Sequence, residues 1–225
     1  MNLVEAITAY GHENFDDKNE WYQWHRINPK HLPSGISLPS GNAFVQNISL
    51  RKQLSTSYRN GEIDVRQALI NYYISVSGSV KRRRAQNLQN YSQDEPKTLI
   101  AKGIKGIASW STALTLREPD RYSIYDARVA LSLNLLQITK AVENPLFFPL
   151  LRGQNKAVDL GCQEVVRFAT QHGCRSALRT NFYEDYNNTL HHVSKRLKVE
   201  SHMIEMLLFA KPILLLETLY DREQW

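Results

Sequence analysis

The sequence has few cysteines and lacks the cysteine pattern of a metal-binding protein. Among its 225 residues only Cys162 and Cys174 are cysteines, and their spacing matches no standard zinc-binding pattern. Two thiolates are also too few for an iron–sulfur cluster, which takes four. We therefore expect two reduced, buried thiols, as is usual in the cytoplasm, although the pair is also compatible with a disulfide.

Long apolar runs are also missing. The two longest, residues 203–210 and 212–216, are too short to cross a bilayer. The first residues, MNLVEAITAYGHENFDD, contain acids and lack the basic start and apolar run of a signal peptide. These absences predict a cytoplasmic protein that has no membrane partner.

The sequence lacks the short motifs of several large enzyme classes. It contains no P-loop, no dinucleotide-binding glycine pattern, no nucleophile elbow and no HExxH. His191, His192 and His202 are not spaced to present three metal ligands on one helix face. The kinase, dehydrogenase and hydrolase classes are therefore unsupported, and no metal site is expected.

Positive charge is in excess: 28 basic side chains against 22 acidic ones give a formal net charge of +6. This balance favours an acidic partner, most often nucleic acid, although a basic enzyme of another kind fits about equally well. The densest basic run comprises Lys81, Arg82, Arg83 and Arg84. It is interpreted either as a contact to DNA phosphates or as the solvated start of a helix.

Apolar residues recur at helical spacing along most of the chain and predict an all-α, mostly helical fold. Residues 1–60 are predicted to form an irregular N-terminal arm and a first helix. Residues 61–225 are predicted to form one helical domain, in a monomeric protein. Residues 74–80 are compatible with a short strand, which would add a minor β element, or with the end of a helix that Gly78 breaks.

The segment from Leu99 to Leu136 carries the clearest local signal. Two short helices, residues 99–107 and 109–117, are predicted to meet at a tight turn around Gly103 and Gly106. Backbone amides at the start of the second helix would face a phosphate, and Lys102 and Lys105 would add positive charge beside it. The turn is therefore a candidate clamp for one DNA strand.

Asp126 follows this hairpin and is predicted to start a third helix, residues 126–141. An aspartate at this position commonly caps the helix, and capping alone would explain the residue type. Arg128 is interpreted either as a phosphate contact or as a surface charge of the helix.

A hairpin, a second helix, a turn and then a helix-opening aspartate resemble the helix-hairpin-helix DNA glycosylases, most closely the 8-oxoguanine-glycosylase-like branch found in bacteria. KGIKGIASWS matches the hairpin, and EPDRYSIYDARVA matches the approach to the catalytic aspartate. YYISVSGSVKRRRAQNL and YEDYNNTLHHVSKRLKVESHMIEMLLFA are further similar segments. The resemblance covers roughly residues 64–210 and leaves about the first fifty residues unmatched.

The resemblance implies a glycosylase that hydrolyses the N-glycosidic bond of a base flipped out of double-stranded DNA. Asp126 would be its catalytic carboxylate, and the hairpin would hold phosphates, with a monovalent cation bound to its carbonyls and no other cofactor. Members that also nick the strand carry a lysine 18 to 20 residues before the aspartate. That window holds no lysine here, and Lys105 lies one residue outside it. We therefore expect a monofunctional enzyme, acting in DNA repair or in defence against phage DNA with modified cytosines.

Two further questions are left open by the sequence. Trp24, Trp110 and Tyr125 could stack on a flipped base or wedge the duplex, although core packing is a common role for each. The missing lysine also allows an alternative function, a catalytically inactive helix-hairpin-helix module that only binds DNA.

Overall fold

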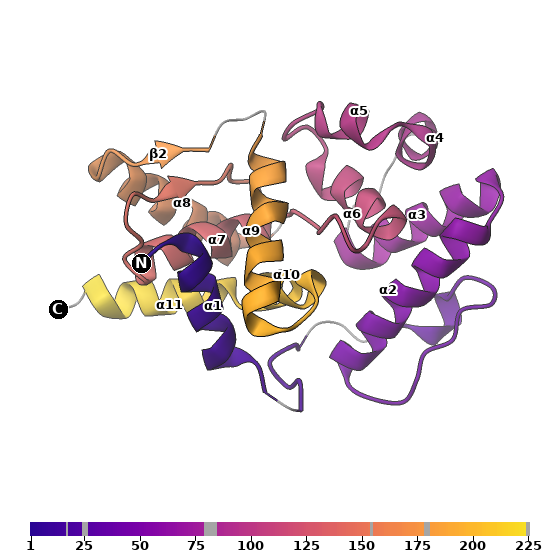
Figure 1. The fold of residues 1–225 in the computed structure, drawn as a ribbon, viewed down its shortest axis with the longest axis horizontal. Helices are drawn as coiled ribbons and strands as arrows, with labels where there is room; N and C mark the ends of the chain where they lie inside the picture. The colour runs from indigo at the N-terminus through magenta and orange to yellow at the C-terminus, as the bar shows by residue number, and fades with distance from the viewer. Residues whose placement is uncertain (17, 24–26, 79–84, 154, 178–180, 224–225) are drawn as a thin grey trace. The chain divides into compact units, whose positions relative to one another are not determined.

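The computed structural model describes residues 1–16, 18–23, 27–78, 85–153, 155–177 and 181–223 (Figure 1). The chain divides into two compact units: unit 1 comprises Met1–Phe15 and Tyr125–Trp225, and unit 2 comprises Asp16–Ile124. This division differs from the predicted boundary at residue 60. Residues 43–60 form a helix that packs on the helices that follow it, whereas the first helix packs on elements from the C-terminal half.

The described residues form eleven α-helices, one 3-10 turn and a single pair of two-residue strands, which confirms the prediction of an all-α fold with a minor β element. The strands are β1 (Leu146–Phe147) and β2 (Arg175–Ser176), which pair in parallel. Residues 74–78 are not a strand but the end of a helix. In that helix Leu69, Ile70, Tyr73 and Ile74 are buried, which is the spacing of one helical face.

Unit 2 is built around one buried helix, α6 (Ile107–Arg117), which makes most of its contacts with three neighbours. These neighbours are α2 (Ala43–Asn60), α3 (Ile63–Gly78) and α4 (Ala85–Gln93). The short helix α5 (Pro96–Ile100) precedes α6. Residues 28–41, predicted as irregular, contain only the 3-10 turn η1 (Pro29–His31) before Asn42 caps α2.

Unit 1 is built around α7 (Ala127–Thr139), which is buried over most of its length. Among its partners, α7 contacts α1 (Leu3–Asn14), α8 (Lys156–Gln171), α10 (Ser201–Ala210) and α11 (Pro212–Glu223). The remaining helix, α9 (Phe182–Leu197), packs on α1 and α10 (Figure 1). Of these helices the sequence predicted α7 individually and placed α8 to α11 only within a helical domain over residues 61–225.

Two buried amides fix the residues around β1 against α7. Asn134 donates to the carbonyl of Phe148 at 2.9 Å and accepts from its N–H at 2.8 Å. Gln137 exchanges the same pair of hydrogen bonds with Leu146, at 3.0 and 2.8 Å. Each amide therefore satisfies a backbone donor and a backbone acceptor that burial would otherwise leave unpaired. The helix that Asp126 opens is thereby held rigidly within unit 1.

Both cysteines are free and half-buried in the structure, so the predicted burial is only partial. Burial raises the pKa of the Cys162 thiol to about 11, which keeps it protonated at neutral pH. Within the part of the chain that the structure describes, none of the helices combines the length and the apolar character needed to cross a membrane.

Candidate functional site

The predicted hairpin is present in unit 2, as α5, a turn over residues 101–106, and α6. Gly103 and Gly106 adopt φ angles of +57° and +70°, and Gly106 is the N-cap residue of α6. Residues other than glycine rarely adopt this backbone conformation, so the turn depends on both glycines. The first helix ends at Ile100 rather than at residue 107, because the following residues form successive tight turns with hydrogen bonds between residues three apart.

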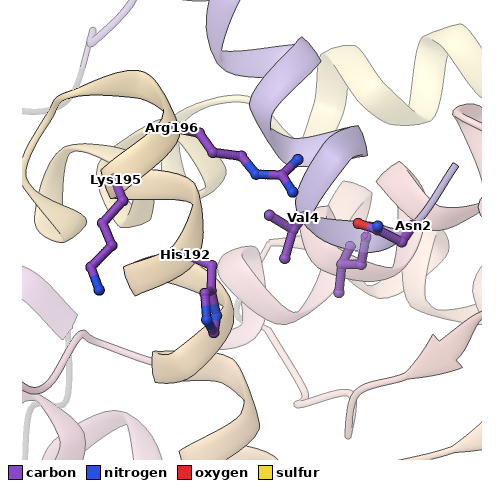
Figure 2. Close-up of a pocket in the computed structure, with 6 residues that line it drawn as sticks. Asn2, Val4, His192, Lys195 and Arg196 are labelled. Atoms are coloured by element: carbon purple, nitrogen blue, oxygen red, sulfur yellow. The ribbon is translucent and has the colours of Figure 1, made fainter.

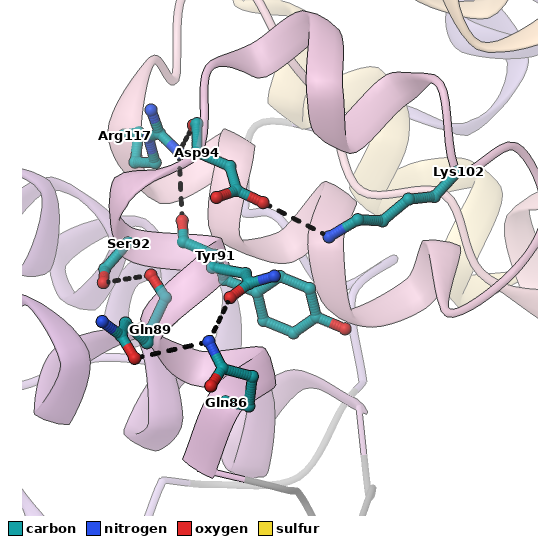
Figure 3. Close-up of polar contacts among 8 residues, drawn as sticks. Gln86, Gln89, Tyr91, Ser92, Asp94, Lys102 and Arg117 are labelled. Carbon is teal, nitrogen blue, oxygen red and sulfur yellow. Dashed lines mark hydrogen bonds and ion pairs between the residues drawn. The ribbon is translucent and has the colours of Figure 1, made fainter.

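The C-terminal end of α4 anchors the hairpin (Figure 3). Arg117 of α6 donates to the carbonyls of Tyr91 and Asp94, at 3.0 and 2.8 Å. The Lys102 ammonium lies 3.5 Å from a carboxylate oxygen of Asp94 and 5.6 Å from the centre of the Tyr91 ring. Lys102 thus has a partner within the protein. Of the two hairpin lysines, Lys105 is exposed and Lys102 is half-buried.

Asp126 caps α7 in unit 1. Its Oδ1 atom accepts hydrogen bonds from the N–H groups of Arg128 and Val129, both at 2.9 Å. Its Oδ2 atom accepts no hydrogen bond from any residue that the structure describes. The residue is half-buried. The backbone therefore fixes the carboxylate through one oxygen, and the other oxygen has no hydrogen-bond donor among the described residues.

Burial raises the pKa of Asp126 above its ordinary value of 3.8, and this effect outweighs the opposing one of the two N–H groups and the nearby Arg128 charge. The raised pKa means that the ionised carboxylate lacks part of the solvation it would have in water. A cation that develops next to it would supply that missing stabilisation.

Tyr125, the residue before Asp126, packs against two other aromatic rings. The ring of Tyr125 lies 5.3 Å from Phe182 and 5.2 Å from Tyr186, in edge-to-face arrangements. Tyr125 has no exposed surface, and its hydroxyl donates to the carbonyl of Pro149 at 2.7 Å. Of its two predicted roles, the structure shows the packing one: Tyr125 is a core residue of unit 1, and its ring is closed off from a base at the surface.

The sequence did not single out Glu205 of α10, which is only 3% exposed. Burial raises the pKa of Tyr186 well above 10, and the charges of Glu205 and Asp126 add to this effect. Tyr186 therefore stays protonated and lies near two carboxylates. A signal was present in the sequence, because Glu205 is the single acid in the otherwise apolar run of residues 203–210.

Arg128 interacts with the end of α10. Its Nε atom donates to the carbonyl of Phe209 at 2.7 Å, and one terminal nitrogen donates to the carbonyl of Ala210 at 3.2 Å. Its guanidinium also lies 5.1 Å from the centre of the Phe209 ring. A cation at this position satisfies the last carbonyls of the helix. The structure thus gives Arg128 a structural role that neither sequence interpretation, phosphate contact or surface charge, had included.

We expect Arg128→Ala to destabilise unit 1 by about 1.5–3 kcal/mol, the usual cost of losing hydrogen bonds made by a charged group. The midpoint of urea unfolding would measure this loss. The matched control is Arg152→Ala, because Arg152 is an exposed arginine of the same unit and its loss should change stability by less than about 0.5 kcal/mol. An unchanged midpoint together with weakened DNA binding would contradict the structural role and restore the phosphate contact.

The other predicted DNA-binding and stacking residues fall into two groups. Trp110 of α6 has no exposed surface and is the largest fully buried side chain among the described residues, so it packs in the core of unit 2 and is not presented as a wedge. Trp24, Arg82, Arg83 and Arg84 lie outside the described residues, as does Lys81.

The turn offers carbonyl groups for the monovalent cation that the resemblance implies. The carbonyls of Lys102 and Ile104 accept hydrogen bonds within the turn. Those of Ala101, Gly103 and Lys105 accept none from the described backbone. Carbonyl oxygens suit such a hard cation, so these three groups are the ones that fit it. No cluster of three His, Cys, Asp or Glu side chains suited to a metal ion occurs among the described residues.

Comparisons of the chain with protein-family models, with curated proteins and with solved structures find no match.

Proposed function

We propose that the chain is a monofunctional DNA glycosylase with Asp126 as its catalytic carboxylate. The observation that carries this proposal is the geometry of Asp126. One carboxylate oxygen is fixed by two N–H groups of α7, the other accepts nothing from the described residues, and burial raises the pKa. A fixed, poorly solvated carboxylate is suited to stabilise the positive charge that builds on the sugar when an N-glycosidic bond breaks.

The hairpin supports the DNA-binding part of the proposal. Its exposed Lys105 and the glycine turn before α6 offer a cation and backbone amides to a phosphate of double-stranded DNA. The first turn of α6 begins at Ile107 and contains no lysine, so water is the expected nucleophile. Asp126 would orient this water with the same free oxygen. A monovalent cation at the turn carbonyls would help to hold the phosphate.

The experiment that tests the proposal is base release. Wild-type protein would be incubated with DNA that carries normal, oxidised, alkylated or glucosylated bases, and abasic sites would be counted with an aldehyde-reactive probe. We expect abasic sites in one kind of DNA, formed about 10²- to 10³-fold more slowly with Asp126→Asn. If no DNA of the panel yields abasic sites, the glycosylase proposal fails.

A second function is favoured by the same residue. Asp126 caps α7, and this structural task gives a sufficient reason for an aspartate at the position. The chain would then be a catalytically inactive DNA-binding module that uses the hairpin alone. Intact binding to duplex DNA without base release in the panel above would select this function.

We expect Lys105→Ala to weaken binding to duplex DNA and to reduce the slope of log K against log salt by about 0.9, the effect of one lost phosphate contact. Fluorescence anisotropy across a salt series would measure both quantities. Lys30→Ala is the control, because Lys30 is an exposed lysine of the same unit outside the hairpin. Equal effects of the two variants would mean that only the net charge matters and that the hairpin makes no specific contact.

As a biological setting we propose a cytoplasmic, monomeric repair enzyme or a defence factor that removes bulky modified cytosines from phage DNA. The support is the family resemblance together with the basic net charge of +6. The base-release panel separates these roles, because a defence factor of this kind would release glucosylated bases and would not release oxidised bases.

A further inference from the structure

A groove in unit 1 combines cationic side chains with an apolar wall. Its volume is about 610 Å³, enough to hold a nucleotide, and it is open to solvent. One wall is the start of α1, with Asn2, Leu3 and Val4, and the other is the last part of α9, with His192, Lys195 and Arg196. In Figure 2 the guanidinium of Arg196 extends toward the first turn of α1, close to Val4.

The three basic residues lie on one face of α9, at positions i, i+3 and i+4. All three are exposed, and none of their side chains makes a hydrogen bond or ion pair to any residue in the described part of the chain. The nearest acid in the first turn of α1 is Glu5, whose carboxylate already accepts the Asn2 N–H at 3.0 Å. No carboxylate therefore neutralises the cations of this groove within the described residues.

An occupant of the groove must be anionic and must also tolerate contact with Leu3 and Val4. A DNA strand meets both conditions, because its phosphates carry the charge and its sugars present apolar faces. The open shape of the groove suits a chain that passes through it rather than an enclosed small molecule. The geometry points to this groove as a second DNA-backbone contact, made by unit 1 and separate from the hairpin of unit 2.

This inference rests on the DNA-binding part of the proposed function and extends it. The hairpin is the contact that the family resemblance implies, whereas the α1–α9 groove uses residues that carry no predicted role in DNA binding. Lys195 and Arg196 would each pair with a phosphate oxygen. Contacts of this kind raise affinity for any sequence and make it steeply dependent on salt.

The test is equilibrium binding of the full chain to an undamaged 30-base-pair duplex at several salt concentrations. We expect the double variant Lys195→Ala, Arg196→Ala to lower the affinity about tenfold at low salt and to reduce the salt slope by about 1 to 2, as for two lost phosphate contacts. The control is Arg152→Ala with Lys156→Ala. It removes the same charge from exposed positions of unit 1 outside the groove and should leave the slope nearly unchanged.

A second variant changes the opposite wall. Val4→Glu places a carboxylate in the first turn of α1, a position where the helix dipole favours an acid and folding should be retained. We expect it to weaken DNA binding as well, because it repels a phosphate in the groove. Wild-type affinity in Val4→Glu, or equal losses in the two double variants, would overturn the groove as a DNA contact.

The outcomes separate this inference from the proposed function. If the wild-type chain binds no duplex, both fail. If it binds duplex but the groove variants behave like wild type, only the groove contact fails. If the groove variants weaken binding while no base is released from any DNA, the groove contact holds and the glycosylase proposal fails.

Discussion

Asp126→Asn is expected to reduce base release by about 10²- to 10³-fold, the usual loss when one electrostatic stabiliser of a transition state is removed. The asparagine keeps an oxygen that can accept the N–H groups of Arg128 and Val129, so α7 keeps its cap. DNA affinity should therefore stay close to that of wild type. Abasic-site counting and fluorescence anisotropy on the same preparations would measure the two quantities.

Stability provides the control for this variant. Asp126→Ala removes the cap and should cost about 0.5–2 kcal/mol, whereas Asp126→Asn should cost little or even stabilise the protein, because it removes a poorly solvated charge. Urea denaturation would measure the free energies of unfolding of the two variants. Loss of base release in Asp126→Asn that is accompanied by loss of structure would not support a catalytic role.

The pH dependence of stability follows from the same carboxylate. Its pKa is raised in the folded state, so the folded chain binds the proton more tightly than the unfolded chain does. Its contribution to stability is fully present below pH 3.8 and is lost as the pH rises through the folded-state pKa. Asp126→Asn should remove this contribution, so that the variant gains stability relative to wild type as the pH rises through that range. A difference in the free energy of unfolding between the two proteins that stays constant across this pH range would contradict the raised pKa.

Trp110→Ala is expected to destabilise unit 2 by about 3–5 kcal/mol, because it deletes a fully buried indole from the central helix of that unit. Such a loss is a large part of the about 5–15 kcal/mol that stabilises a typical domain. Chemical unfolding followed by circular dichroism would measure it. The affinity for DNA should decrease only to the extent that the hairpin unfolds.

Trp110→Phe separates packing from a direct role in DNA recognition. Phenylalanine keeps a ring in the core, so the variant should fold and should bind DNA as wild type does. Val166→Ala serves as a surface control, since Val166 is 55% exposed and its truncation should change stability by less than about 0.5 kcal/mol. A well-folded Trp110→Phe protein that loses DNA binding or base release would show that the indole contacts DNA.

Local patterns were sufficient to predict much of the fold. The hairpin was recognisable because glycine is required at positive φ, and α7 because a capping aspartate precedes an apolar face. The end of the first hairpin helix was misplaced because successive tight turns share the short spacing of a helix. Residues 74–78 could not be assigned from the sequence, since β-branched residues next to a glycine suit a strand end and a helix end alike.

Roles that depend on distant partners could not be predicted. Arg128 bonds to carbonyls 81 and 82 residues later in the chain, and no local pattern reveals such a pairing. The basic face of α9 could be read from the spacing of His192, Lys195 and Arg196, but its apposition to the start of α1 could not. The capping position of Asp126 was predicted, whereas its raised pKa depends on burial that only the fold provides.

The division of the chain has a consequence for its synthesis. Unit 2 occupies residues 16–124 without interruption, so all of its helices have been made before α7 leaves the ribosome. Helix α1 is made before unit 2, yet its packing partners include α7, α9 and α10, the last of which ends at Ala210. We expect unit 2 to fold during translation, while α1 stays without these partners until α10 has emerged. A nascent chain stalled shortly after α7 would thus contain a folded hairpin and an unprotected helix α1, which makes α1 the natural point of attack for proteases and chaperones.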